Sequence, residues 1–208
     1  MSPSGPPVVR PIEIISQFEM PMRIYVLLTG LAAMPAFALN LTVLLDIEQR
    51  HAPSTLVEMR KELAKVFKPT HLTLDVRLRQ DAQPNETYAD VVLVKLKGTC
   101  RMQDLAPLID ERGPFAFTHT VEGKILPFSE VACSHIAHSI HQAMGGLDLD
   151  RDRLLGRALA RVMAHEIVHI VGKSSEHSKA GVFRHALSGR QLIADKLELD
   201  PEDIARLP

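Results

Sequence analysis

Residues 150–172 read DRDRLLGRALARVMAHEIVHIVG, and this stretch decides how the rest of the chain is interpreted. Apolar residues such as Leu155 and Leu159 recur at helical spacing, after an aspartate-rich start that suits the N-terminal cap of a helix. Gly172 is of a residue type at which helices often end. We therefore predict a long, central and mostly buried helix over about Asp150–Val171. Three arginines are expected on its polar side: Arg151, Arg157 and Arg161.

The predicted helix carries the pattern H-E-x-x-H at His165, Glu166 and His169. Positions i and i+4 share one face of a helix, so the two imidazoles converge on a point where a zinc ion can bind, with Glu166 beside it to accept a proton. Alternatively, these are hydrogen-bonded or surface residues, which the 10 histidines in this chain make less improbable than usual. The apolar surroundings favour the metal, because buried polar groups need partners.

A catalytic zinc ion typically takes three protein ligands and one water, so a third ligand is required. His177 is the preferred candidate, since a short loop after the helix keeps it near the metal at a small entropic cost. Four other donors stay open as alternatives: Glu176, His185, Asp195 and Glu198.

The segment that follows the helix resembles the metzincin clan of zinc peptidases, whose helix ends at a glycine that lets the chain turn back to a third histidine. Gly172 matches that glycine, whereas His177 comes two residues after the metzincin position, which Ser175 holds. Phe183 stands near the place of the clan's Met-turn methionine. Residues 177–182 also resemble the H-S-x-x-G pattern of a set of exported bacterial H-E-x-x-H proteins. The resemblance implies a zinc metallopeptidase without naming a substrate.

The remaining elements predict an α+β fold with a small mixed sheet packed on the long zinc-binding helix, and the resemblance implies that this fold is metzincin-like. Expected strands cover residues 39–47, 72–79, 91–96, 115–121 and 124–128, the last two as a hairpin. Expected helices cover residues 55–67, opened by a Thr55–Glu58 capping box, 130–144, about 188–199, and a short segment that starts at Asp200. Such a sheet offers an edge to an extended peptide.

The second predicted helix carries histidines at three-residue spacing, which makes a second metal site conceivable. A solvated or locally hydrogen-bonded set is the favoured alternative, because no acidic or cysteine partner completes a site. These residues are His135, His138 and His141.

An export signal is predicted ahead of this domain. Residues 24–38 follow Arg23 with an apolar core and end in the small-x-small sequence before Leu39, which fits cleavage after Ala38. Residues 1–38 are thus an unstructured leader plus signal peptide, and residues 39–208 a single zinc-peptidase-like domain. A membrane helix over residues 24–45 is the alternative. Both place the domain outside the cytoplasm, secreted or periplasmic.

Two cysteines are present, Cys100 and Cys133, and an even pair in an oxidising compartment most simply forms one disulfide. Two buried free thiols are the alternative. In a further alternative, Cys133 is a metal ligand as in peptide deformylases, although their glycine-rich motif is missing from the folded region.

The composition excludes some partners. A formal net charge of -1 argues against nucleic acid, and 4% aromatic residues with no tryptophan argue against stacking platforms. The sequence therefore predicts an exported zinc-dependent peptidase that acts on peptides or proteins, with no membrane contact beyond the signal or an N-terminal anchor. An inactive zinc-stabilised binding protein and a deformylase-like amidase are the alternatives.

Overall fold

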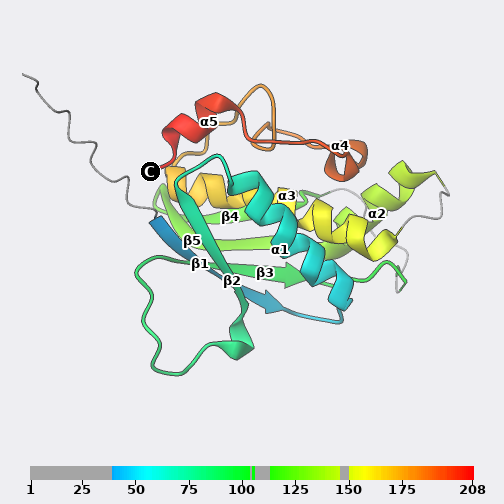
Figure 1. Cartoon of the computed structure of the whole chain (residues 1–208), viewed down its shortest axis with the longest axis horizontal. Helices are drawn as coiled ribbons and strands as arrows, with labels where there is room; N and C mark the ends of the chain where they lie inside the picture. Colours follow the sequence, from blue (N-terminus) through cyan, green and yellow to red (C-terminus); the bar gives the residue numbers. More distant parts are fainter. Residues whose placement is uncertain (1–38, 104, 106–112, 146–149) are drawn as a thin grey trace, which may run out of the picture. The chain divides into compact units, whose positions relative to one another are not determined.

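The computed structural model describes residues 39–103, 105, 113–145 and 150–208. They form an α+β domain in which a five-stranded sheet carries helices on one face (Figure 1). The predicted leader and signal peptide, residues 1–38, lie outside the described residues. Within those described, no helix is both long enough and apolar enough to cross a bilayer.

The sheet is mixed, as predicted, with the strand order β2-β1-β3-β5-β4. Neighbours pair in parallel except β4, which runs antiparallel to β5. In the described part of the chain β4 is therefore an edge strand. The strands are β1 (Leu39–Ile47), β2 (Leu72–Leu78), β3 (Val91–Lys97), β4 (Ala116–Val121) and β5 (Lys124–Ala132).

The helix-facing side of the sheet is the apolar one. In β1 and β3 alternate residues are buried, and the register places Val43 beside Val92 and Leu45 beside Val94. Two-residue periodicity in the sequence produces this arrangement, because successive side chains of a strand point to opposite faces. The predicted strands are confirmed, and β5 is longer than expected.

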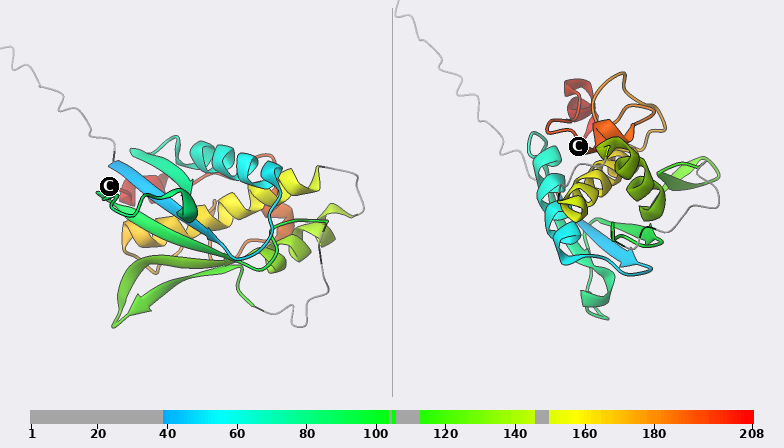
Figure 2. Two further views of the ribbon diagram at one scale, coloured as in Figure 1. Left: turned by 90° about the horizontal axis from the view of Figure 1, so that it is seen from below. Right: turned by 90° about the vertical axis from the view of Figure 1, so that its right-hand side faces the viewer.

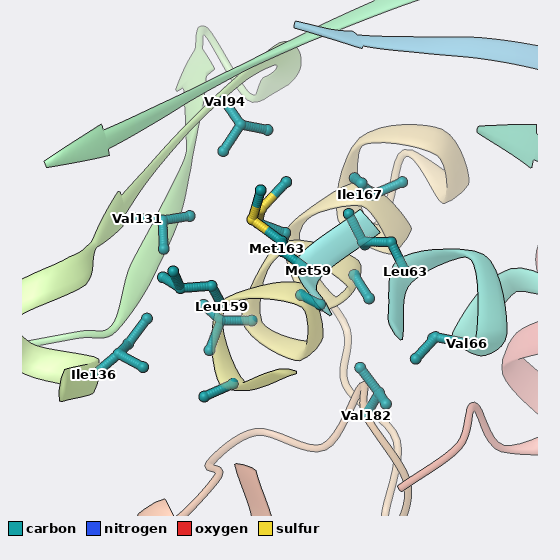
Figure 3. Packing of buried hydrophobic residues seen from close by; sticks show 14 of the residues in the cluster. Met59, Leu63, Val66, Val94, Val131, Ile136, Leu159, Met163, Ile167 and Val182 are labelled. Carbon is teal, nitrogen blue, oxygen red and sulfur yellow. The ribbon is translucent and has the colours of Figure 1, made fainter. Parts of the chain in front are cut away.

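Five helices complete the described domain: α1 (Pro53–Phe67), α2 (Cys133–Met144), α3 (Arg151–Gly172), α4 (Gly189–Ile193) and α5 (Pro201–Arg206). The two longest, α1 and α3, lie against each other and on the same face of the sheet (Figure 2). Figure 3 shows the core between them, where Met59 and Leu63 of α1 meet Met163 and Ile167 of α3. Each such buried side chain contributes about 1.5–3 kcal/mol.

The start of α1 differs from the prediction. The helix begins at Pro53, which suits the first turn because it needs no N–H there, and its cap residue Ala52 has no side-chain hydrogen bond. Thr55 was expected to cap the helix, but its hydroxyl donates to the carbonyl of Asp152 in α3, at 3.1 Å. The predicted capping box is therefore wrong, because a tertiary contact takes its hydroxyl.

Three other boundaries also differ. Residues 130–132 belong to β5, where Glu130 pairs with Lys95 of β3, so α2 begins only at Cys133. Gly172 is the last helical residue of α3, and the left-handed conformation that ends the helix is at Lys173, with φ 47°. The expected helix over 188–199 is limited to α4.

Arg161 does not lie on a polar face of α3 as predicted. It is fully buried, with its Nη2 atom 2.7 Å from Glu62 of α1. Its Nη1 atom donates to the carbonyls of Gln191 and Leu192 at 3.0 and 3.1 Å. Burial lowers the pKa of Arg161, and the Glu62 carboxylate opposes that shift. The guanidinium thus connects α1, α3 and α4, which the helical pattern alone could not indicate.

Cys100 and Cys133 form the predicted disulfide, which joins the segment after β3 to the first residue of α2. A disulfide is compatible with a location outside the cytoplasm. The alternative of a membrane helix over residues 24–45 conflicts with the structure, because its last seven residues belong to strand β1.

Candidate metal centre

Helix α3 brings His165 and His169 together. They are four residues apart, so their side chains lie on the same face of the helix. Their Nε2 atoms are 3.1 Å apart. This pair needs only a regular helix, whose apolar residues fix its orientation in the core.

His177 completes a triangle from the loop that follows α3. Its Nε2 atom lies 3.2 Å from that of His165 and 3.2 Å from that of His169. In the described part of the chain these three are the group of possible metal ligands, and the four alternative donors are not members of it. Two of those form ion pairs elsewhere, Asp195 with Arg157 and Glu198 with Lys196.

Backbone carbonyls orient the two helical imidazoles. His165 Nδ1 lies 3.1 Å from the carbonyl of Val182, and His169 Nδ1 lies 2.6 Å from the carbonyl of Ser174. A carbonyl only accepts, so each Nδ1 carries the proton and each Nε2 presents a lone pair to the centre of the triangle. Two lone pairs 3.1 Å apart repel each other unless a cation lies between them.

The environment keeps the imidazoles neutral, as metal ligands must be. Burial lowers the pKa of His165 to about 4, although its hydrogen bond to Val182 acts in the opposite direction. Burial also lowers the pKa of His169 and of His177.

The triangle has the size that a metal ion requires. Nitrogen ligands about 2.0–2.1 Å from a tetrahedral zinc ion lie about 3.3 Å from each other. The three observed separations, 3.1, 3.2 and 3.2 Å, are close to this value. Three histidines can thus hold a metal ion, and imidazole suits zinc as well as other transition metals.

Phe183 forms the floor beneath the three imidazoles. Its ring centre lies 5.1 Å from that of His165, 4.6 Å from that of His169 and 5.5 Å from that of His177. It is almost fully buried, so it separates the candidate site from water on that side. A phenylalanine supplies the apolar base that the sequence comparison with the Met-turn suggested.

Glu166 is held at the site by the edge strand. The hydroxyl of Thr118 in β4 donates to Glu166 Oε2 at 2.7 Å. Burial raises the pKa of Glu166, and the Thr118 hydrogen bond opposes this rise. The pairing of β4 with β5 is irregular between Thr118 and Thr120, and such bulges often redirect side chains near functional sites.

Two of the cavities lined by described residues border the histidines. The first, of about 250 Å³, is lined by apolar residues including Phe115 and Leu187, together with His165, Glu166 and Arg184. The second, of about 290 Å³, is bordered by residues of β4 and by all three histidines. His185 borders both cavities. Glu166 borders both cavities as well.

Three of these contacts had no signal in the sequence. Nothing in the hairpin pattern indicates that Thr118 faces Glu166, and no motif links Ser178 to Asp203, although their side chains are hydrogen bonded. The Glu62–Arg161 pair was also missed.

Among the described residues, the three histidines of α2 do not gather into a possible metal site. Cys133 is part of the disulfide, which argues against the deformylase-like alternative.

Comparison with models of known protein families and with curated proteins finds no match. The function is therefore argued from the geometry of the site.

Proposed function

We propose that the protein is an exported zinc-dependent metallopeptidase, with His165, His169 and His177 as the zinc ligands and Glu166 as general base. The observation that carries the proposal is the triangle of Nε2 atoms, 3.1–3.2 Å apart, with a buried carboxyl group next in sequence to one corner. A metzincin-like relationship is part of the proposal and is supported by the motif and by the position of Phe183.

A zinc ion bound by three imidazoles supplies Lewis acidity, which lowers the pKa of a coordinated water to about 7 and polarises a carbonyl group. Glu166 accepts a proton from the attacking water and transfers it to the amine that leaves when the peptide C–N bond breaks. Thr118 holds Oε2, which keeps the carboxylate aligned and leaves Oε1 for the proton. Phe183 excludes water from below.

The edge strand β4 supports a peptide or protein as the substrate. Ala116 borders both cavities, and Phe117, Thr118 and Thr120 border the second. Among the described strands β4 is at the edge of the sheet, so it can offer backbone groups to a further strand. An extended peptide can pair with such an edge and pass over the histidines. The disulfide, compatible with an oxidising compartment, supports export.

The test combines metal analysis of purified residues 39–208 with cleavage of a broad peptide library. We expect one zinc ion per chain, and Glu166→Gln should keep the zinc and lower cleavage by about 10²–10⁴-fold. The matched control is Glu176→Gln, an exposed acidic residue outside the triangle, which should leave zinc and activity unchanged.

Two results would redirect the proposal. Stoichiometric zinc without cleavage of any peptide would favour the inactive, zinc-stabilised binding protein. Cleavage that survives Glu166→Gln would remove Glu166 as the base.

A further inference from the structure

The third histidine lies in a loop, so a regular helix does not fix its position. Within residues 177–184, which we name the His177 loop, the N–H of Ser178 donates to the carbonyl of Phe183 at 3.0 Å, and Ser178 forms a bridge with Arg184. These contacts make the loop compact. They do not by themselves orient it relative to α3.

The C-terminal segment supplies that orientation. The N–H of Val182 donates to the carbonyl of Glu198 at 2.9 Å, and the carbonyl of Val182 in turn faces His165. Gly181 has a φ of +71°, and a Cβ atom there would lie 2.6 Å from the Glu198 carbonyl oxygen. The backbone of the His177 loop thus lies directly on residues that follow α4.

One side-chain contact joins the loop to the last helix. The Ser178 hydroxyl donates to Oδ1 of Asp203, a residue of α5 that is 1% exposed. Oδ2 of Asp203 is buried too and has no hydrogen-bond partner among the described residues. The carboxylate is held in place by the first turn of α5, where the N–H of Asp203 donates to the carbonyl of Asp200 at 2.9 Å.

We propose that Ser178 and Asp203 are positioning residues for the metal ligand His177, so that the C-terminal helix α5 sets the affinity of the site. The inference rests on the proposed function. Ser178 is adjacent to His177. Its hydrogen bond to Asp203 already restricts the loop in the metal-free protein, so the loop loses less conformational freedom when the metal binds. Loss of a residue that orients a ligand typically weakens metal binding by about 10–100-fold.

A buried carboxylate oxygen that has no partner among the described residues lowers the free energy of unfolding, so stability alone does not account for this contact. The geometry indicates instead that the Asp203 carboxylate contributes by fixing the position of the His177 loop through Ser178. The stability of the metal-free domain and its affinity for zinc should therefore respond differently to changes at this contact.

The experiment measures zinc affinity by competition with a chromophoric chelator, next to the thermal stability of the metal-free protein. Ser178→Ala should weaken zinc binding by about tenfold, and Ser178→Thr, which keeps the hydroxyl, should restore it to within about threefold. Asp203→Asn keeps an acceptor oxygen and should likewise lose less than Ser178→Ala. The matched control is Ser188→Ala, which removes the N-terminal cap of α4 and costs similar stability without touching the His177 loop.

Two readouts separate positioning from general destabilisation. In a His177→Ala background, Ser178→Ala should cause no further loss of zinc affinity, because its effect acts through the missing ligand. With cobalt in place of zinc, Ser178→Ala should alter the visible absorption spectrum, whereas Ser188→Ala should not.

Equal zinc affinity of wild type and Ser178→Ala, or an equal loss in Ser188→Ala, would overturn the inference alone. A wild-type domain that binds no divalent metal would instead overturn the proposed function, and this inference with it.

Discussion

The candidate site has two halves that are built in different ways. His165 and His169 lie on α3, a 22-residue helix whose packing against α1 and the sheet fixes their direction. His177 lies on a loop in which Val182 and Ser178 contact Glu198 and Asp203 of the C-terminal segment. The histidine pair on the helix is thus prearranged by secondary structure, whereas the position of His177 depends on the tertiary fold.

The largest expected effect tests this comparison directly. His169→Ala should weaken zinc binding by at least about a thousandfold, because it dismantles the rigid pair, and His177→Ala by about a hundredfold. An apparent zinc-binding free energy of about 10–16 kcal/mol shared by four ligands gives losses of this order. Competition titration with a chelator provides the measurement. An equal loss in both variants would show that the halves are equivalent and break the comparison.

Arg161 joins the helix that carries His165 and His169 to α4, through the carbonyls of Gln191 and Leu192. Arg161→Met removes the buried partner of Glu62 and leaves that carboxylate only the half-exposed Lys65, 3.8 Å away, so we expect the free energy of unfolding to fall by about 3 kcal/mol. Denaturant unfolding of the zinc-free domain measures the change. Combining Arg161→Met with Glu62→Leu should recover much of the loss.

The matched control for this change is Arg157→Met, one turn earlier on α3. Its partner Asp195 is fully exposed, so the loss from the ion pair should be at most about 1 kcal/mol. If the free energy of unfolding falls by a similar amount in the two variants, the buried Glu62–Arg161 pair contributes no more to stability than the exposed Arg157–Asp195 pair.

The same division explains what the sequence could predict. Local periodicity identified α3, the strands and the hairpin, and the i, i+4 spacing identified His165 and His169. His177 was reached through loop length and resemblance. Contacts between distant residues, such as Thr55 with Asp152 or Thr118 with Glu166, leave no periodic trace, so they were missed or replaced by a local expectation. The prediction for Arg161 was wrong because it relied on charge alone. A charged residue can be buried when its partners come from other elements, as Glu62 of α1 does here.

Neither cysteine belongs to the histidine triangle, so the disulfide should affect stability without affecting metal binding. Replacing Cys100 and Cys133 together by alanine opens a link that spans 33 residues, so we expect a loss of about 2–4 kcal/mol in the free energy of unfolding. Zinc affinity should stay within about threefold of wild type. A variant that releases zinc while it remains folded would revive Cys133 as a ligand, as in the deformylase-like alternative.

The smallest expected effect is the pH dependence of the free energy of unfolding. It tests the difference between the two halves of the site, because the histidines on α3 are buried more deeply than His177. Burial lowers the pKa of His165 to about 4, whereas the unfolded chain has the ordinary value near 6.5. Between these values the unfolded state binds more protons than the folded state, so stability is full above about pH 6.5 and falls as the pH drops towards 4. We expect a decline of about 1–3 kcal/mol for the metal-free domain in the presence of a chelator. His165→Gln should make the decline shallower, and His71→Gln, at an exposed position outside the candidate site, should leave it unchanged. An identical pH profile for His165→Gln and wild type would show that this imidazole is not desolvated in the metal-free protein.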